Sequence, residues 1–424
     1  MDLVAGVVVS AATGCGSPRI AIVGGGPAGL ATAVALSCHG LGDDLAVLDP
    51  SGGWLTAWRE RFAAQRIAHL RSPAVHHPHP EPFALHRHLR EHDLDDELLH
   101  VGGTHLPTAV GFDRFTDDLV GEVGLGDHVI PTGAVGLADD RGRPVLRLDD
   151  GTTMRPDRVV LATNTRTPAI PAGLQAAVAV DAATVGDRLH LDDTPDGGHV
   201  VVVGGGLSAT HLALGAVAAG ATVSMVTRHR IAVRRYDVHP SWLGPKKRRP
   251  FETEPDPHVR RRTLDNARGG GSVPHRFKRA LDRAEADGLL RLHERVRPID
   301  ALPAGPRTQV CLDDGTAIVA DAVWLATGGR IDVEVDPLLA SLRTTRPAPV
   351  VGGLPELGPD LAWPGTRVHL TGAAAGLQLG PLAGNLIGHR RAASRIVAGL
   401  LGLDPLRADR VVTGTRACPQ LPVR

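Results

Sequence analysis

The sequence has few cysteines and no spacing that would make them act together. Its four cysteines are scattered along 424 residues and form no C-x-x-C pair. This spacing argues against a disulfide framework, a structural zinc site and a redox-active dithiol. We therefore expect a reducing, cytoplasmic location. The four are Cys15, Cys38, Cys311 and Cys418.

Long apolar runs and an excess of charge of one sign are also missing. No stretch approaches the ~18 apolar residues of a membrane-spanning helix, and basic and acidic residues number 46 each. A neutral chain sets up no overall field that attracts nucleic acid or an anionic membrane. The basic run at residues 246–249 lacks interleaved aromatic residues, so it indicates a solvated loop. We expect neither nucleic acid nor membrane as a partner.

Histidines are plentiful, but the usual metal-binding patterns are absent. His76, His77 and His79 open a histidine-rich stretch that extends to residue 92. Prolines at every second position from 78 to 82 prevent a helix from presenting these imidazoles, and no H-E-x-x-H motif accompanies them. We predict no metal, and a loop that is solvated or lines a ligand.

Residues 19–49 carry the first strong signal, a glycine-rich loop in a strand–loop–helix–strand context. In G-x-G-x-x-G loops, the first glycine permits a tight turn, the second lets a pyrophosphate approach the backbone, and the third lets the helix pack on the strand. The N-terminus of the helix then favours the phosphates, and an acid after the next strand binds ribose hydroxyls. The residues predicted to hold a dinucleotide here are Gly24, Gly26, Pro27, Ala28, Gly29 and Asp49.

The same pattern recurs at residues 199–228. A buried strand leads into a G-x-G-x-x-A loop and a helix, and the next strand ends in Thr227-Arg228, where the first unit has Asp49. An arginine at this position pairs with the 2′-phosphate of NADP, which an acid would repel. The second unit therefore favours NADPH over NADH. Its predicted cofactor-binding residues are Gly204, Gly206, Leu207, Ser208, Ala209, Arg228 and Arg230.

Two further patterns follow the glycine loops. Residues 145–161 and 309–326 each predict a β-hairpin whose second strand is strongly apolar and ends in Ala-Thr. Near the C-terminus, residues 368–372 predict a strand and turn, and Gln378 to Pro381 open a helix that extends to about residue 400. A helix that begins at Pro381 directs its dipole at developing negative charge.

Two such loops, each followed by a hairpin, resemble the two-dinucleotide-domain flavoprotein superfamily over nearly the whole chain. That resemblance implies FAD on the first unit, NAD(P)H on the second, and a C-terminal strand and helix that return to the flavin. We expect an α/β fold with two Rossmann-like domains, the FAD domain being discontinuous and the NADPH domain inserted. The expected limits are 1–17 for a disordered extension, 18–165 and 330–402 for the FAD domain, 166–329 for the NADPH domain, and 403–424 for a tail.

Within that superfamily, the chain is most similar to N-hydroxylating flavin monooxygenases acting on ornithine or lysine side chains. Their D-x-x-x-L-A-T-G motif is matched by Asp321, Leu325, Ala326, Thr327 and Gly328. The family continues with tyrosine, whereas this chain has Gly329. Residues 54–73 resemble its flavin-facing segment. The family's amino-acid-binding lysine and asparagine are not found. The resemblance implies catalytic roles for Trp58 and Gln65, and cofactor contacts for Trp54, Arg71, Thr163, Thr327, Gly328, Gly372, Gln378, Gly380 and Pro381.

The leading hypothesis is an FAD- and NADPH-dependent monooxygenase. A hydride from NADPH would reduce FAD, and O₂ would give a flavin C4a-hydroperoxide that hydroxylates a nucleophilic nitrogen or sulfur of a small substrate. One alternative is a reductase or oxidase with the same cofactors but no oxygen insertion. Another is a non-catalytic, regulatory flavoprotein. The sequence names no substrate, and homo-oligomer formation stays open.

Overall fold

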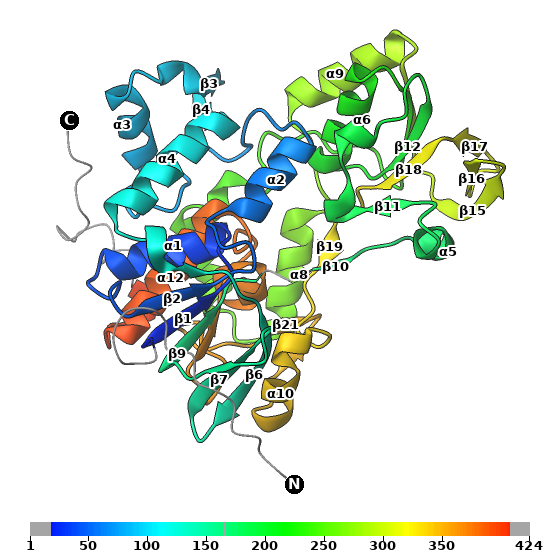
Figure 1. Cartoon of the computed structure of the whole chain (residues 1–424). Helices are drawn as coiled ribbons and strands as arrows, with labels where there is room; N and C mark the ends of the chain where they lie inside the picture. The colour runs from blue at the N-terminus through cyan, green and yellow to red at the C-terminus, as the bar shows by residue number, and fades with distance from the viewer. Residues whose placement is uncertain (1–17, 164–165, 408–424) are drawn as a thin grey trace.

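A computed structural model describes residues 18–163 and 166–407. The extension predicted for residues 1–17 and the tail from residue 408 onward lie outside the described residues. Two parallel five-stranded sheets, each accompanied by helices, form two lobes (Figure 1). The α/β class, the two Rossmann-like units and the insertion of the second into the first are confirmed.

The first sheet combines strands from both ends of the chain, which makes its lobe discontinuous in sequence. β1 is apolar and fully buried, because helices or loops cover both faces of a parallel sheet. It pairs in parallel with β2 and β9, and β22, which lies more than 200 residues further along the chain, pairs with β9. The order is β22 (Val368–Leu370), β9 (Arg158–Leu161), β1 (Ile20–Val23), β2 (Leu45–Leu48) and β5 (Val129–Ile130).

Two helices from opposite ends of the chain pack on this sheet. α1 (Pro27–Ser37) is rich in alanine and buried on nearly every side, so it lies close against its neighbours. α12 (Leu386–Leu400) packs directly against it (Figure 1). The main hydrophobic core joins both helices to the sheet and extends to Phe112 and Phe115 of α4 (Ala109–Glu122). Phe112 and Phe115 therefore form the apolar face of α4.

The second sheet repeats this construction within one continuous segment. Its order is β11 (Thr184–Val185), β18 (Ala322–Leu325), β12 (His199–Val203), β13 (Thr222–Thr227) and β14 (Leu290–Glu294), all parallel. α6 (Leu207–Ala218) follows β12 and contributes Leu212 and Ala213 to its core. The chain enters this lobe through β10 (Thr167–Pro168) and leaves through β19 (Gly329–Arg330), which pair with each other.

The two predicted hairpins are wrong in their partners. β7 (Arg143–Leu148) pairs with β6 (Ala134–Asp140) and with the short β8 (Thr153–Met154), while the apolar β9 enters the first parallel sheet. In the second unit, β16 (Arg307–Leu312) pairs with β15 (Pro298–Ala304) and β17 (Ala317–Ala320), and β18 enters the parallel sheet. An apolar run without alternation suits a sheet that is covered on both faces.

The other elements complete the two lobes. None of the helices in the described ranges combines the length and apolar character that crossing a bilayer requires. Cys38 is disulfide-bonded, which the scattered cysteines did not predict. The remaining helices are α2 (Thr56–Ala64), α3 (Ala84–Glu91), α5 (Gln175–Ala179), α7 (Pro245–Thr253), α8 (Pro257–Arg268), α9 (His275–Ala286), α10 (Ala340–Thr345) and α11 (Gly376–Leu379), and the remaining strands are β3 (Leu98–Val101), β4 (Thr104–Pro107), β20 (Val350–Val351) and β21 (Leu354–Pro355).

Candidate functional site

The first glycine loop connects β1 to α1 under tight steric limits. Gly24 has a φ of +109°, and a Cβ on it would lie 2.9 Å from the carbonyl oxygen of Ala162, just after β9. A Cβ on Gly29 would lie 1.9 Å from the carbonyl oxygen of Gly24. Only glycine fits at these two positions. Their predicted steric roles are thus confirmed, while dinucleotide binding stays a prediction.

The middle of this loop is open, unlike its two ends. A Cβ on Gly26 would meet no atom within 4 Å. α1 begins at Pro27, and no side chain caps its N-terminus. The backbone N–H groups of an uncapped first turn, where Ala28 lies, attract an anion. A phosphate can therefore approach the backbone here.

Asp49 is fixed at the end of β2 by the loop itself. Its Oδ2 accepts a hydrogen bond of 2.7 Å from the backbone N–H of Gly25. Its Oδ1 accepts hydrogen bonds from the backbone N–H and the hydroxyl of Ser51, at 3.0 and 2.6 Å. Oδ2 retains further acceptor capacity, because a carboxylate has about four lone-pair sites and these three hydrogen bonds leave one on Oδ2. The side chain is therefore oriented beside the loop and can accept hydrogen bonds from ribose hydroxyls.

The second glycine loop has the same tight turn as the first, but Thr227 stands beside it where the first loop has Asp49. Gly204 has a φ of +148°, and a Cβ on it would lie 2.4 Å from the carbonyl oxygen of Ala326, after β18. A Cβ on Gly205 would lie 2.4 Å from Oγ1 of Thr227. In the first loop, the equivalent neighbour is the carboxylate of Asp49. The second site thus has a hydroxyl where the first has a negative charge.

The phosphate-facing part of this loop is also open. A Cβ on Gly206 would meet no atom within 4 Å, and α6 starts at Leu207 without a side-chain cap. Ser208 lies in the first turn, and Ala209 packs fully buried under the loop. Gly271 packs against one side of this loop, since a Cβ on Gly271 would lie 3.3 Å from Cα of Gly206.

Two arginines follow β13 beside this loop. Arg228 and Arg230 are both exposed. Neither forms a hydrogen bond or an ion pair with any residue in the described ranges. Their guanidinium groups therefore remain available for an anionic ligand.

The aromatic residues predicted to face the flavin belong to the core. Trp54 is 8% exposed, and its Nε1 donates a 3.0 Å hydrogen bond to the carbonyl oxygen of Leu125. Trp58 on α2 stacks on Phe62, with ring centroids 4.5 Å apart. Gln65 ends α2 and is buried, not solvated. The flavin contacts of Trp54 and the catalytic roles of Trp58 and Gln65 stay predictions.

Arg71 connects the first lobe to residues 234–272, the segment whose Gly271 lies beside the second glycine loop. Its guanidinium donates hydrogen bonds to the carbonyl oxygen and hydroxyl of Ser272, at 2.9 and 2.8 Å. It also donates to the carbonyl oxygens of Arg234 and Arg235, at 3.0 and 3.4 Å, and lies 3.7 Å from Asp237. Burial lowers the pKa of Arg71 from its usual value. These contacts connect two lobes, and the predicted cofactor contact stays a prediction.

We expect Arg71→Ala to destabilise the protein by about 3 kcal/mol, because the carbonyl oxygen and hydroxyl of the buried Ser272 lose a charged donor. Thermal unfolding and limited proteolysis of residues 234–272 measure this loss. Arg66→Ala is the matched control, since Arg66 also bridges to the second lobe but pairs with Asp192 in solvent. That exposed pair contributes at most ~1 kcal/mol. Equal losses in the two variants would contradict the interlobe role of Arg71.

Unpartnered polar atoms gather where the parallel strands end. Thr371 follows β22, and Thr327 follows β18, at the same edges as the two glycine loops. Among the described residues, the hydroxyls of both threonines and both side-chain polar atoms of Gln378 lack hydrogen-bond partners. Buried polar groups normally have partners, so these atoms fit a ligand with polar ring edges such as a flavin. Gly328, next to Thr327, and Thr163, which follows β9, are both exposed.

The C-terminal helix does not begin at Pro381 as predicted. α11 ends at Leu379, Gly380 turns the chain with a φ of +80°, and α12 starts only at Leu386. Gly380 lies against Trp242 and Phe251, so the turn is shaped by packing. Gly372 also has a positive φ, of +69°. Pro381 is buried in the turn, and it cannot direct the α12 dipole.

The histidine-rich stretch is largely buried, not solvated. His77 is fully buried, with its Nε2 3.1 Å from the carbonyl oxygen of Pro82. Nδ1 of His79 accepts a hydrogen bond from the backbone N–H of Glu81. Burial lowers the pKa of His76 and of His79 to about 4. These imidazoles are therefore neutral at pH 7, and the prolines shape a packed turn.

Residues 234–262 contain helices that the sequence did not predict. α7 and α8 border a hollow of about 680 Å³, which Arg234, Tyr236 and Lys247 help to line. The side chain of Asp256 accepts from the backbone N–H of His258, and Pro257 starts α8. An aspartate cap followed by proline was the sequence signal that could have found this helix.

Comparisons with known proteins agree with this arrangement. The family model for pyridine nucleotide-disulphide oxidoreductases matches residues 18–240. A comparison with curated proteins finds no match. Among solved structures, the ornithine N-hydroxylase of Kutzneria sp. 744, with reduced FAD, NADP⁺ and L-ornithine, is 17% identical, with a TM-score of 0.73, covering 91% of this chain and 99% of that one.

Two further solved structures have the same fold. The FAD-bound cadaverine monooxygenase DfoA of Erwinia amylovora is 15% identical, with a TM-score of 0.73, covering 92% of this chain and 96% of that one. The L-lysine 6-monooxygenase of Pseudomonas syringae is 20% identical, with a TM-score of 0.69, covering 91% and 99%. At these identities, the likeness shows the fold.

Proposed function

Because this chain belongs to the pyridine nucleotide-disulphide oxidoreductase family, we propose that it is an FAD- and NADPH-dependent monooxygenase. The observation that carries this proposal is the pair of equivalent, open glycine loops in a fold shared almost end to end with N-hydroxylating enzymes. The lack of a C-x-x-C pair speaks against disulfide reduction within this family.

In this proposal, FAD occupies the first loop. Gly26 and the first turn of α1, with Pro27 and Ala28, hold the pyrophosphate, and Asp49 binds the ribose. The unpartnered side chains of Gln378 and Thr371 bind polar edges of the flavin. The sheet order supports a discontinuous FAD domain, residues 18–165 with 330–402.

NADPH occupies the second loop and the inserted domain, residues 166–329. Gly206 and the first turn of α6 hold its pyrophosphate, and Thr227 replaces the acid that would repel a 2′-phosphate. Arg228 and Arg230 pair with that phosphate. The covering segment at Gly271 closes over the nucleotide from the side held by Arg71.

We expect the double variant Arg228→Ala with Arg230→Ala to raise the KM for NADPH about 10- to 100-fold, because charged hydrogen bonds to phosphate contribute ~1.5–3 kcal/mol. The KM for NADH should stay unchanged. Steady-state NAD(P)H oxidation measures both. Arg291→Ala, which removes an exposed arginine from β14 of the same sheet, is the control. A parallel rise for both nucleotides would contradict this assignment.

The chain's own residues mainly position the cofactors and the substrate, and they exclude water from the site. A bound FAD would supply the redox chemistry, namely electron uptake from NADPH and activation of O₂ as the oxygen donor. Such chemistry needs a dry site and no side-chain nucleophile. Gln65 and Gln378 are both buried, and in this proposal they donate hydrogen bonds to the cofactors and accept them. Cytoplasmic location and homo-oligomer formation stay predictions.

Product analysis during aerobic NADPH oxidation tests the function directly. We propose a small substrate with a nucleophilic nitrogen or sulfur, so amines, amino acids and thioethers are screened. Substrate-dependent NADPH use with one hydroxylated product per NADPH supports oxygenation. Hydrogen peroxide equal to the NADPH consumed with every substrate indicates an oxidase instead, and reduction of an added acceptor without O₂ uptake indicates a reductase.

A further inference from the structure

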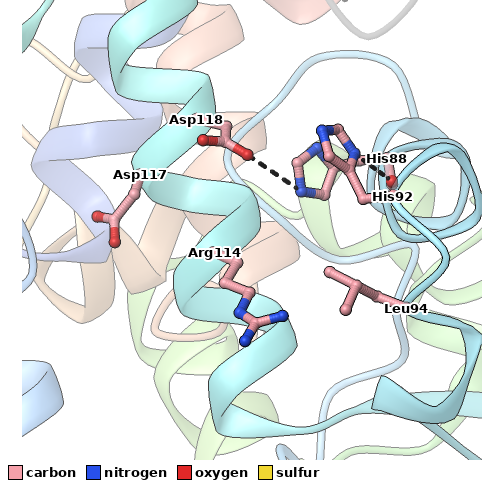
Figure 2. A pocket seen from close by; sticks show the side chains of 6 residues that line it. All are labelled: His88, His92, Leu94, Arg114, Asp117 and Asp118. Atoms are coloured by element: carbon pink, nitrogen blue, oxygen red, sulfur yellow. Dashed lines mark hydrogen bonds and ion pairs between the residues drawn. The ribbon is translucent and has the colours of Figure 1, made fainter.

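Far from both glycine loops in sequence, α3 and α4 pack together and bring two histidines and an aspartate into one cluster. His88 comes from α3, His92 directly follows the last residue of α3, and Asp118 comes from α4 (Figure 2). A hollow of about 400 Å³ lies beside them and is also lined by Leu94, Arg114 and Asp117. The cluster is therefore accessible from solvent through this hollow.

His88 presents a buried nitrogen that nothing in the described ranges satisfies. Its side chain is 2% exposed, and its Nε2 has no hydrogen-bond partner. The facing atom is Oδ2 of Asp118, at 3.5 Å, which is too far for a good hydrogen bond. A buried polar atom in this state calls for a missing partner.

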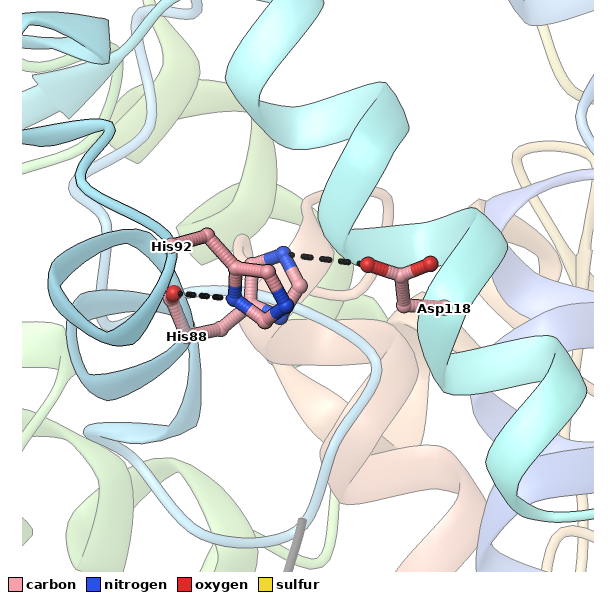
Figure 3. Close-up of side chains that lie close together, drawn as sticks. All are labelled: His88, His92 and Asp118. Carbon is pink, nitrogen blue, oxygen red and sulfur yellow. Dashed lines mark hydrogen bonds and ion pairs between the residues drawn. The ribbon is translucent and has the colours of Figure 1, made fainter. Parts of the chain in front are cut away.

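His92 is oriented to supply a second nitrogen. Its Nδ1–H donates a 2.8 Å hydrogen bond to the backbone carbonyl oxygen of His88, which leaves Nε2 with a free lone pair (Figure 3). The two imidazole rings lie 4.3 Å apart. A ring N–H held by a backbone carbonyl is the usual support of a metal-binding histidine.

We propose that His88, His92 and Asp118 bind one divalent transition-metal ion of the Zn²⁺ type, with water from the hollow as fourth ligand. Their three ligand atoms lie within 4.8 Å of one another. A tetrahedral ion with bonds of ~2.0–2.1 Å separates its ligand atoms by roughly 3.4 Å, which matches the 3.5 Å gap between His88 and Asp118. A small rotation of the His92 ring would bring its nitrogen to the same distance from the ion as the other two ligand atoms.

The local charge suits a cation. Arg114 lines the hollow, but Asp117 and Asp118 offset its charge, and Asp117 also pairs with Arg59. Glu122 and Glu91 lie close enough to interact electrostatically with this cluster, and their carboxylates add negative charge nearby. Imidazole and carboxylate ligands together suit Zn²⁺ better than Mg²⁺ or Ca²⁺. A bound ion would link α3 to α4.

Zn²⁺ titration of the purified full-length protein by calorimetry tests this site without any turnover of NADPH. Because other histidines also bind Zn²⁺ weakly, the comparison is between variants. His92→Gln and Asp118→Asn each remove one exposed ligand, and His258→Gln removes an exposed imidazole from α8 as the matched control. Circular dichroism confirms that all variants are folded.

The site predicts one Zn²⁺ equivalent in the unaltered protein and in His258→Gln, with affinity at least about tenfold weaker in both ligand variants. Co²⁺ bound in the same place should give visible absorption typical of a tetrahedral ion, and both ligand variants should lose it. If the unaltered protein binds no Zn²⁺, or if His92→Gln and Asp118→Asn bind it as the control does, the site is refuted. Neither outcome depends on the proposed monooxygenase activity.

Discussion

Gly29→Ala is expected to cost more than ~3 kcal/mol of folding free energy and to abolish flavin binding. The added Cβ would lie 1.9 Å from the carbonyl oxygen of Gly24, a backbone atom that cannot move without displacing the loop. That carbonyl belongs to the turn between β1 and α1 at the centre of the main core, so relief of the clash would separate helix from sheet. Overpacking of this kind exceeds the usual range because no flexible side chain can yield.

Gly26→Ala is the matched control, only three residues away in the same loop. A Cβ at Gly26 would meet no atom within 4 Å, so the fold should keep nearly its full stability. The methyl group would instead occupy the space through which a pyrophosphate approaches. Urea unfolding and flavin content, measured on both variants, separate the two effects. A stable, flavin-loaded Gly29→Ala protein would contradict the steric account of the loop.

Acidification from pH 7 to pH 5 is expected to remove most of the stability. His79 and His389 are buried, His76 and His211 are half-buried, and desolvation lowers the pKa of each to about 4. Since the unfolded chain binds these protons near pH 6.5, stability is fully present above pH 6.5 and is lost as the pH falls toward 4. Each histidine then costs about 2 kcal/mol at pH 5, against a typical total of ~5–15 kcal/mol.

His76→Gln tests the origin of this acid sensitivity. Only half-buried, His76 can be replaced without a large cavity, and the variant should lose less stability between pH 7 and pH 5 than the unaltered protein. His258→Gln, which removes an exposed imidazole, should follow the unaltered protein. Unfolding free energies from urea titrations at several pH values measure the slopes. Identical slopes for all three proteins would show that buried histidines do not set the acid limit.

The glycine loops could be predicted because local geometry dictates them. The tight positions at Gly24, Gly29 and Gly204 each face a backbone oxygen, and only one residue type fits there, so the sequence pattern carries the structure. The discontinuous first sheet followed from the resemblance, not from local pattern, since pairing of β22 with β9 spans about 200 residues.

Features decided by distant contacts could not be predicted. The apolar strand β9 follows a hairpin-like turn, yet burial on both faces places it in the parallel sheet. The polar segment at 245–268 forms α7 and α8 because Phe251 and Leu264 pack against residues near position 380. Arg71 faces backbone carbonyls of the other lobe, which no local pattern reveals. The four-residue spacing of His88 and His92 is visible in the sequence. Their proximity to Asp118 depends on the packing of α3 on α4, which no local pattern predicts.

Anaerobic mixing of the purified protein with NADPH, followed by absorption spectroscopy, tests the central claim most directly. The account predicts a protein-bound flavin that NADPH bleaches faster than NADH does, and whose bleaching by NADPH slows in the double arginine variant. Readmission of O₂ should then give an oxygenated flavin that decays with formation of a hydroxylated product. A protein without flavin, or a bound flavin that NADPH does not reduce, would contradict the account and favour a non-catalytic role.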